Sequence, residues 1–99
     1  MKNISKIIWS VEALKDLKEI FDYLELKWTE REMKSFARKL GRQIEIIKSQ
    51  PLIYPQSRKK NIRRAVISRQ TTLYYELSTD EIRIVSLFDN RKDPKKLTI

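Results

Sequence analysis

Apolar residues recur every three or four positions in two stretches of the first half of the chain. In the first stretch Ser10 offers an N-cap oxygen, and Glu12 places a carboxylate in the first turn, where the helix dipole favours it. This spacing predicts an amphipathic helix over residues 10–27. Its apolar stripe comprises Leu14, Leu17, Phe21, Leu24 and Trp28, joined by Ala13 and Ile20.

The second stretch predicts a helix over residues 29–49, which Pro51 ends. Thr29 and Glu32 have the spacing of a capping box, in which each side chain bonds to the other residue's amide. Gly41 inside the helix costs about 1 kcal/mol relative to Ala, so we expect it to mark a close approach between the two helices. The apolar stripe comprises Met33, Phe36, Ala37, Leu40, Ile44 and Ile47.

Strand patterns surround the two helices. Residues 4–9 predict a first strand, and three further strands over 62–67, 72–77 and 82–88 are separated by short turns. The order β-α-α-β-β-β predicts an α+β fold, in which a helical hairpin packs on a small, mainly antiparallel sheet. Residues 90–99 predict a basic tail interrupted by Pro94. Because 99 residues suffice for one core, we expect one domain spanning residues 1–99.

Positive charge is concentrated in the second half of a chain whose net charge is +9. Between Arg58 and Arg69 there are six cations and no acidic residue, which is typical of a surface that meets a polyanion. A solvated charged face is the alternative. Arg63 and Arg64 point to opposite faces if both lie in a strand. The candidate target-binding or nucleic-acid-binding residues are Arg58, Lys59, Lys60, Arg63, Arg64, Arg69 and Arg91.

The chain contains neither cysteine nor histidine. Disulfides and thiolate metal sites are therefore excluded, and the usual general base and metal ligand are missing, so we expect no metal and no cofactor. No apolar run exceeds three residues, whereas a membrane span needs about 20. We expect a cytoplasmic protein that makes no membrane contact.

Two groups of residues resemble the RelE/ParE superfamily of toxins from bacterial type II toxin–antitoxin pairs. The first group resembles the opening of a ParE-type toxin: Trp9-Ser10, Ala13, Asp16-Leu17, Ile20 and Tyr23-Leu24. The second group resembles its second half: Arg63-Arg64, Tyr74-Tyr75, Ile82-Arg83-Ile84, Phe88-Asp89-Asn90-Arg91, Asp93-Pro94 and Leu97. The closing Arg-x-Asp-Pro-x-x-Leu is the most specific match, and the resemblance spans nearly the whole chain.

Within this superfamily, RelE-like members cut messenger RNA in the ribosome, often with a Tyr or His near the C-terminus, whereas ParE-like members are associated with inhibition of DNA gyrase. This chain has no His and no Tyr after Tyr75, which favours the ParE-like branch. The resemblance then implies a non-enzymatic toxin that serves plasmid stabilization and arrests growth. It also implies a cognate acidic, ParD-like antitoxin that joins the toxin in a hetero-oligomer.

An RNA-cleaving enzyme is the second hypothesis, because cations for a pentavalent phosphate are plentiful. Arg63 or Arg64, with Arg83 and Arg91, could meet at strand ends, and Glu76, Lys59 or Lys60 would have to serve as base. The third hypothesis is a non-toxic nucleic-acid-binding module. We expect Tyr75 in the core and Tyr74 half-buried in the sheet rather than stacked on a base, and Asp89 paired with Arg91 or Arg83.

Overall fold

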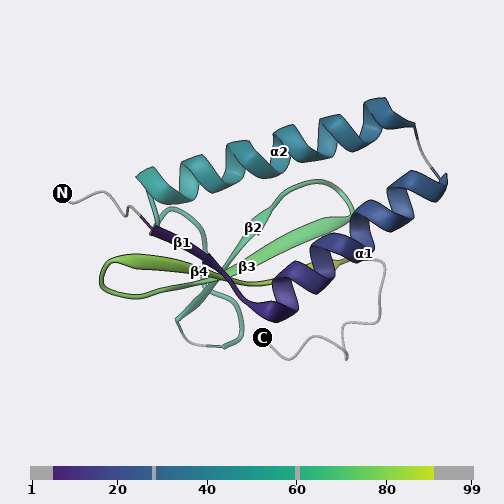
Figure 1. Ribbon diagram of the computed structural model, residues 1–99. Helices are drawn as coiled ribbons and strands as arrows, with labels where there is room; N and C mark the ends of the chain where they lie inside the picture. Colours follow the sequence, from purple (N-terminus) through teal and green to yellow (C-terminus); the bar gives the residue numbers. More distant parts are fainter. Residues whose placement is uncertain (1–5, 28, 60, 91–99) are drawn as a thin grey trace.

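Two helices and one four-stranded sheet form the fold of the residues that the computed structural model describes, which are 6–27, 29–59 and 61–90 (Figure 1). The predicted α+β order is confirmed. In chain order the elements are β1 (Lys6–Trp9), α1 (Val11–Lys27), α2 (Glu30–Ser49), β2 (Ile62–Val66), β3 (Thr71–Leu77) and β4 (Glu81–Asp89). The expectations for Trp28 and for residues 91–99 fall outside the described residues.

The strand order in the sheet is β1-β4-β3-β2. Strands β2, β3 and β4 form the predicted antiparallel meander. Strand β1 pairs parallel with β4, in a register that runs from Lys6 opposite Glu81 to Trp9 opposite Ile84. The first strand of the chain therefore lies beside the last, and both helices lie between them in the sequence.

Ser10 joins three elements where β1 ends and α1 begins. Its hydroxyl oxygen accepts a hydrogen bond from the amide of Ala13 at 3.0 Å, which confirms the predicted N-cap. The same hydroxyl donates to the carbonyl of Val85 at 2.9 Å, and the Ser10 amide donates to the carbonyl of Ile84 at 3.0 Å. The start of α1 is thereby fixed to β4.

The predicted capping box at the start of α2 is wrong. Thr29 is the N-cap residue, but its side chain makes no capping hydrogen bond. Its backbone carbonyl accepts from the amides of Glu32 at 3.0 Å and Met33 at 3.2 Å. Because the Glu32 amide already has this backbone partner, the hydroxyl is not needed to satisfy it.

The expected close approach at Gly41 is also wrong. Gly41 is exposed, and a Cβ atom placed on it would meet no atom within 4 Å. The side of α2 that faces the core is defined by Leu40 and Ile47, and Gly41 is turned about 100° from Leu40 around the helix axis. Gly41 therefore faces solvent rather than α1.

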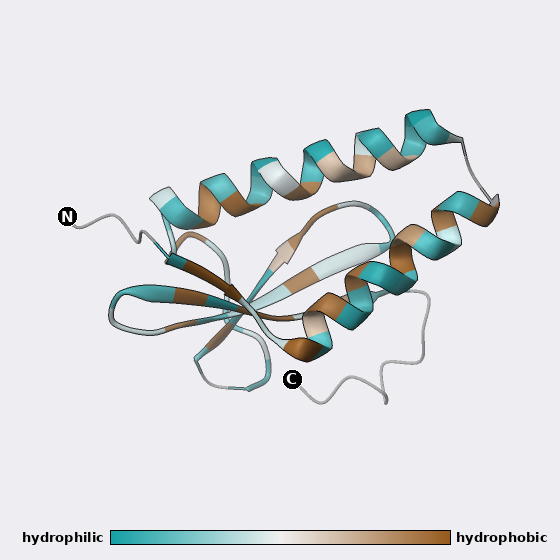
Figure 2. Cartoon of the chain, in the orientation of Figure 1, coloured by the Kyte–Doolittle hydropathy of each residue, from teal (hydrophilic) through white to brown (hydrophobic). Residues whose placement is uncertain are grey.

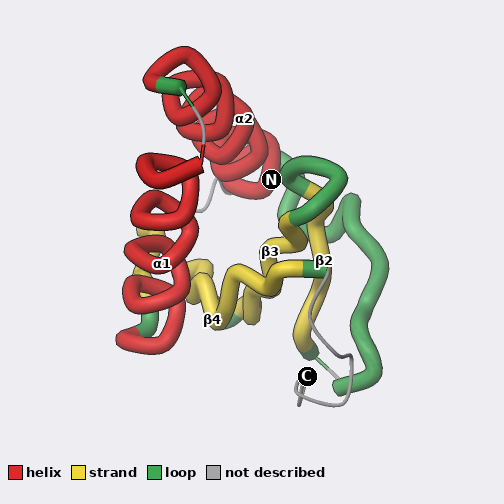
Figure 3. Tube along the Cα trace, turned by 90° about the vertical axis from the view of Figure 1, so that its right-hand side faces the viewer, coloured by secondary structure: helices red, strands yellow, loops and turns green. Residues whose placement is uncertain are grey.

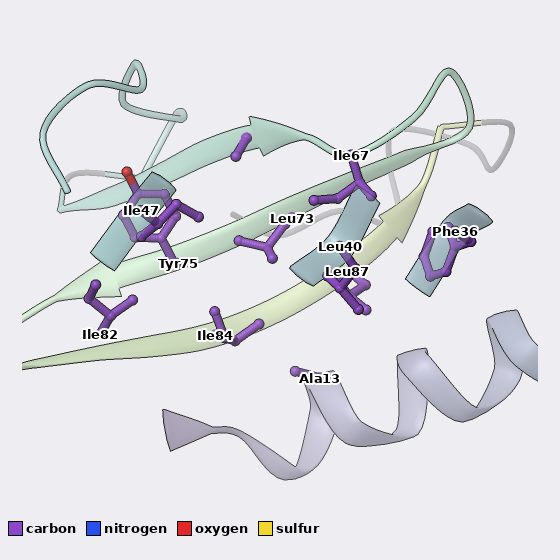
Figure 4. Packing of buried hydrophobic residues seen from close by; sticks show 11 residues of the cluster. Ala13, Phe36, Leu40, Ile47, Ile67, Leu73, Tyr75, Ile82, Ile84 and Leu87 are labelled. Atoms are coloured by element: carbon purple, nitrogen blue, oxygen red, sulfur yellow. The ribbon is translucent and has the colours of Figure 1, made fainter. Parts of the chain in front are cut away.

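Both helices lie on one side of the sheet, which Figure 3 shows from one end of the molecule. Hydrophilic residues follow the outer side of α2 (Figure 2). Helix residues Ala13, Phe36, Leu40 and Ile47 are buried against the sheet (Figure 4). The sheet contributes Ala65, Ile67, Leu73, Tyr75, Ile82, Ile84 and Leu87 to the same cluster.

A β-bulge in β4 accounts for an irregular pattern of buried residues. Ile84 and Leu87 are three positions apart, which would place them on opposite faces of a regular strand. The register instead shifts by one residue, so that Tyr75 pairs with Ile84 whereas Tyr74 pairs with Ser86. Both Ile84 and Leu87 consequently reach the core that the helices cover.

The loop between α2 and β2 runs along the free edge of β2. The carbonyl of Pro55 accepts from the Arg64 amide at 3.1 Å, and the carbonyl of Ile62 accepts from the Ser57 amide at 2.7 Å. Asn61 has a φ of 74°, in the left-handed region that Asn tolerates better than most residues, and turns the chain into β2. The loop satisfies the β2 edge and places its cations beside the start of that strand.

Candidate functional site

The structure spreads the basic run along the whole length of β2. Arg58 and Lys59 are exposed in the loop before the strand, whereas Arg69 is exposed in the turn after it. Because strand residues advance by about 3.3 Å each, the five residues of β2 separate these cations by more than 13 Å. Lys60 and Arg91 lie outside the described residues. The run therefore forms a basic border rather than one compact patch.

Arg63 differs from the other cations because it holds the loop in place. Its side chain is half-buried on the face of β2 that the helices cover, beside Tyr75 of β3. Its Nη1 donates to the carbonyl of Tyr54 at 2.6 Å. Burial raises the pKa of Tyr75 to about 12, the Arg63 guanidinium opposes that rise, and Tyr54 adds to it. This arrangement ties β2, β3 and the loop together.

The opposite face of the sheet brings together three of the residues proposed for RNA cleavage. Arg64 pairs across the strands with Tyr74, and Glu76 pairs with Arg83. Directly opposite residues have Cβ atoms about 5 Å apart, and diagonal neighbours such as Arg64 and Glu76 about 7 Å. Arg64, Glu76 and Arg83 are exposed. We call Arg64, Tyr74, Glu76 and Arg83 the open-face cluster.

The open-face cluster has the chemistry of an anion-binding surface. Two guanidinium groups can bind phosphate or carboxylate oxygens in a bidentate manner, and Glu76 is the acidic group between them. Tyr74 is only 6% exposed, so its ring offers little surface on which a base could stack. This agrees with the expectation of a sheet tyrosine. Any general base at this cluster would be a carboxylate, because the chain contains no histidine.

Asp16 is the most constrained acidic side chain of α1. Its Oδ2 accepts from the Ser86 hydroxyl at 2.9 Å and from the Leu87 amide at 3.1 Å. Since β1 ends at Trp9, opposite Ile84, this carboxylate takes the place of a neighbouring strand for the β4 amide. The carboxylate positions α1 beside the bulge of β4.

A groove between α1, α2 and the end of the sheet was not anticipated from the sequence. Its volume is about 340 Å³. Both helices contribute residues at the same spacing, with steps of three, one and three positions. Helix α1 supplies Asp16, Glu19, Ile20 and Tyr23, and α2 supplies Glu32, Ser35, Phe36 and Lys39. This repeated spacing was visible in the sequence, but the apolar members had been assigned to the core.

No helix among the described residues is long and apolar enough to span a membrane. Those residues also bring no three carboxylates into an arrangement that could hold a metal ion.

A family model for the ParE toxin of the type II toxin–antitoxin system parDE matches residues 7–94. The chain belongs to the ParE toxin family. The match includes both helices, all four strands and every residue of the open-face cluster. No curated sequence matches the chain at a significant level.

Solved structures confirm the fold that this ParE-family chain adopts. A chromosomal ParDE toxin–antitoxin system from P. aeruginosa gives a TM-score of 0.73 at 14% identity, covering 89% of this chain and 98% of that one. The E. coli DinJ-YafQ toxin–antitoxin complex gives 0.62 at 17% identity, covering 97% and 99%. The YoeB dimer from S. aureus gives 0.61 at 17% identity, covering 84% and 93%.

Proposed function

We propose that this ParE-type toxin arrests growth by binding an essential cytoplasmic target, DNA gyrase, and that a cognate antitoxin neutralises it. The observation that carries the proposal is the ParE family match over residues 7–94. The absence of histidine supports binding over catalysis, because the open-face cluster has no imidazole to move a proton near neutral pH. A surface that only binds needs the cations and not the base.

The open-face cluster supports one alternative, a metal-independent endoribonuclease that acts on messenger RNA in the ribosome. Arg64 and Arg83 would stabilise the charge on the phosphate, and Glu76 lies opposite Arg83, where it could accept the proton of the 2′-hydroxyl. Solved neighbours include both ParDE and YafQ proteins, so the fold is compatible with either target. The gyrase hypothesis stays our preference because a carboxylate is a weaker base than imidazole at neutral pH.

Net charge supports an antitoxin of opposite overall charge. At +9, the toxin attracts an acidic polypeptide over a distance of about a Debye length, which speeds association. The DinJ-YafQ neighbour was solved as a toxin–antitoxin complex. We infer that this chain forms a hetero-oligomer with its antitoxin in the same way.

The test is tightly controlled expression of this chain alone, with growth, messenger-RNA cleavage and plasmid supercoiling followed in the same cultures. Gyrase inhibition predicts growth arrest with intact messages and altered supercoiling. Early cuts at codon-linked positions would support the ribonuclease. Steep loss of nucleic-acid binding between low and moderate salt, without arrest, would identify a non-toxic binding module instead.

Variants connect the outcome to the open-face cluster. Arg64→Ala and Arg83→Ala should weaken growth arrest at least tenfold, measured as the expression level that halves the growth rate. The matched control is Arg38→Ala, which removes an exposed cation from α2 without touching the sheet. Equal effects of all three variants would show that net charge matters and that the cluster does not.

A further inference from the structure

The groove between the two helices has the opposite charge to the rest of the molecule. Its described lining contains four carboxylates, from Asp16, Glu19, Glu32 and Asp89, and one ammonium group, from Lys39. In a chain of net charge +9, this is a local reversal of sign. A ligand selected by overall charge would avoid the groove, so its occupant must be recognised by local chemistry.

The floor of the groove is apolar. Ile20 and Leu24 come from α1, Phe36 from α2 and Leu87 from β4. Figure 4 shows Phe36 and Leu87 toward the same end of the core. An apolar floor with a few charged groups at its rim is the usual composition of a binding pocket, and about 340 Å³ is at the small end of the usual range. The groove has room for a small number of side chains and not for a folded domain.

The acidic rim comes from several elements and is held by the fold. Asp16 is fixed by its hydrogen bonds to Ser86 and Leu87. Glu19 lies one turn further along α1, Glu32 lies in the first turn of α2, and Asp89 is the last residue of β4. Since the carboxylates reach the rim from three sides, they are suited to surround one cation of the occupant.

We propose that this groove binds a segment of the antitoxin in which an apolar side chain stands next to a lysine or arginine. The inference rests on the proposed function, because it takes the antitoxin as the partner. It adds that an antitoxin that is acidic overall is anchored here by a basic residue. The apolar side chain fills the space above Ile20, Phe36 and Leu87, and the basic group lies among the carboxylates.

Two synthetic peptides test the sign of the charge. Both carry leucines at helical spacing; one has lysines beside them and the other has glutamates. Titration of the full-length toxin, followed by NMR, should show saturable binding of the lysine peptide, with methyl shifts at Ile20, Leu24 and Leu87. The glutamate peptide should leave these signals unchanged. Shifts of the same methyl groups by both peptides, or by neither, would overturn the proposal.

Toxin variants locate the binding. Glu19→Gln with Glu32→Gln should weaken the lysine peptide about tenfold, because two charge-assisted contacts become neutral. The control pair Glu30→Gln with Glu45→Gln removes the same net charge from carboxylates that pair with Lys34 and Lys48 outside the groove. Equal loss in both pairs would overturn the proposal.

A third variant, Ser35→Phe, fills the groove without altering its charge and should abolish binding of the lysine peptide. An unchanged two-dimensional NMR spectrum away from the groove would show that the variant is folded. Retained affinity in this folded variant would place the peptide elsewhere and overturn the proposal.

The product of the gene adjacent to the toxin gene is the probe for the antitoxin itself. Its dissociation constant, measured by calorimetry, should rise about tenfold with Glu19→Gln and Glu32→Gln and not with the control pair. This measurement does not depend on growth arrest, so a harmless chain would refute the toxin function and leave the groove tested. If Lys95→Glu with Lys96→Glu shifts the groove signals without any peptide, the chain's own basic segment occupies the groove and the proposal fails.

Discussion

The carboxylate of Asp16 accepts a hydrogen bond from the backbone amide of Leu87, 71 positions later in the chain. This contact closes β4 where β1 ends, and it fixes α1 against the sheet. It also explains why Asp16 belongs among the residues that resemble a ParE-type opening. The role of Asp16 is positional, since its acceptor oxygen already has two donors from β4.

Asp16→Ala should therefore destabilise the fold by about 2 kcal/mol, because it leaves the Leu87 amide and the Ser86 hydroxyl without their charged acceptor. Urea denaturation followed by circular dichroism measures the change. The matched control is Asp22→Ala, whose carboxylate is exposed and pairs only with Lys18 on the same helix. That control should stay within about 0.5 kcal/mol of the parent. Equal losses would show that the contact with β4 contributes nothing.

Gly41→Ala should stabilise the protein by about 0.5–1 kcal/mol. Alanine loses less backbone entropy on helix formation, and its methyl group would meet no atom within 4 Å. A higher urea midpoint at unchanged slope is the expected result. Arg42→Ala, at the next exposed position, should change stability little. A loss of stability in Gly41→Ala would restore the close helix–helix approach that the sequence had suggested.

Local signals in the sequence were sufficient to predict the elements, because helix and strand periods are set by residues near one another. Ser10 was correctly identified as a cap, and Tyr75 as a core residue. The two failures, at Thr29 and Gly41, both depended on how a residue faces its surroundings. The ladder between β1 and β4 requires pairing across more than 70 positions, and no local pattern encodes it.

The candidate site shows the same division. Alternation along the strand correctly separated Arg63 from Arg64. The pairing of Glu76 with Arg83, and of Arg64 with Tyr74, depends on register between strands, which the turns and the β4 bulge set. The acidic groove needs the packing of α1 against α2, so its charge was hidden in a chain that reads as basic throughout.

Tyr75 should titrate late. Burial raises its pKa to about 12, although the nearby Arg63 guanidinium partly offsets the effect. An exposed tyrosine in the unfolded chain has a pKa of about 10. Because the folded-state pKa is the higher one, the stabilisation from the neutral phenol is complete below pH 10 and is lost as the pH rises toward 12.

Spectrophotometric titration of the tyrosines should therefore contain a component near pH 12 that is missing in Tyr75→Phe. The variant also loses the hydrogen bond from the Tyr75 hydroxyl to the carbonyl of Pro51, so its stability below pH 10 should fall by about 1 kcal/mol. Tyr74→Phe serves as the matched control and should retain the late component. A titration identical in the parent and Tyr75→Phe would contradict the assignment.

Arg63 and Arg64 are adjacent in sequence and should separate stability from activity. Arg63→Ala removes the hydrogen bond to the carbonyl of Tyr54, so we expect a loss of about 1.5–3 kcal/mol. Arg64→Ala removes an exposed side chain and should change stability by less than about 0.5 kcal/mol. At a temperature where both variants are folded, only Arg64→Ala should weaken growth arrest.

Urea denaturation and the growth assay, performed on the same two variants, decide this prediction. The opposite outcome, in which Arg63→Ala abolishes growth arrest at unchanged stability, would place Arg63 on the surface that meets the target. The hydrogen bond to Tyr54 would then have to break on binding, and the loop of residues 51–61 would be part of the contact. Retained arrest in both variants would exclude this end of β2 from the target surface, because the loop and the open-face cluster would both have been altered without effect.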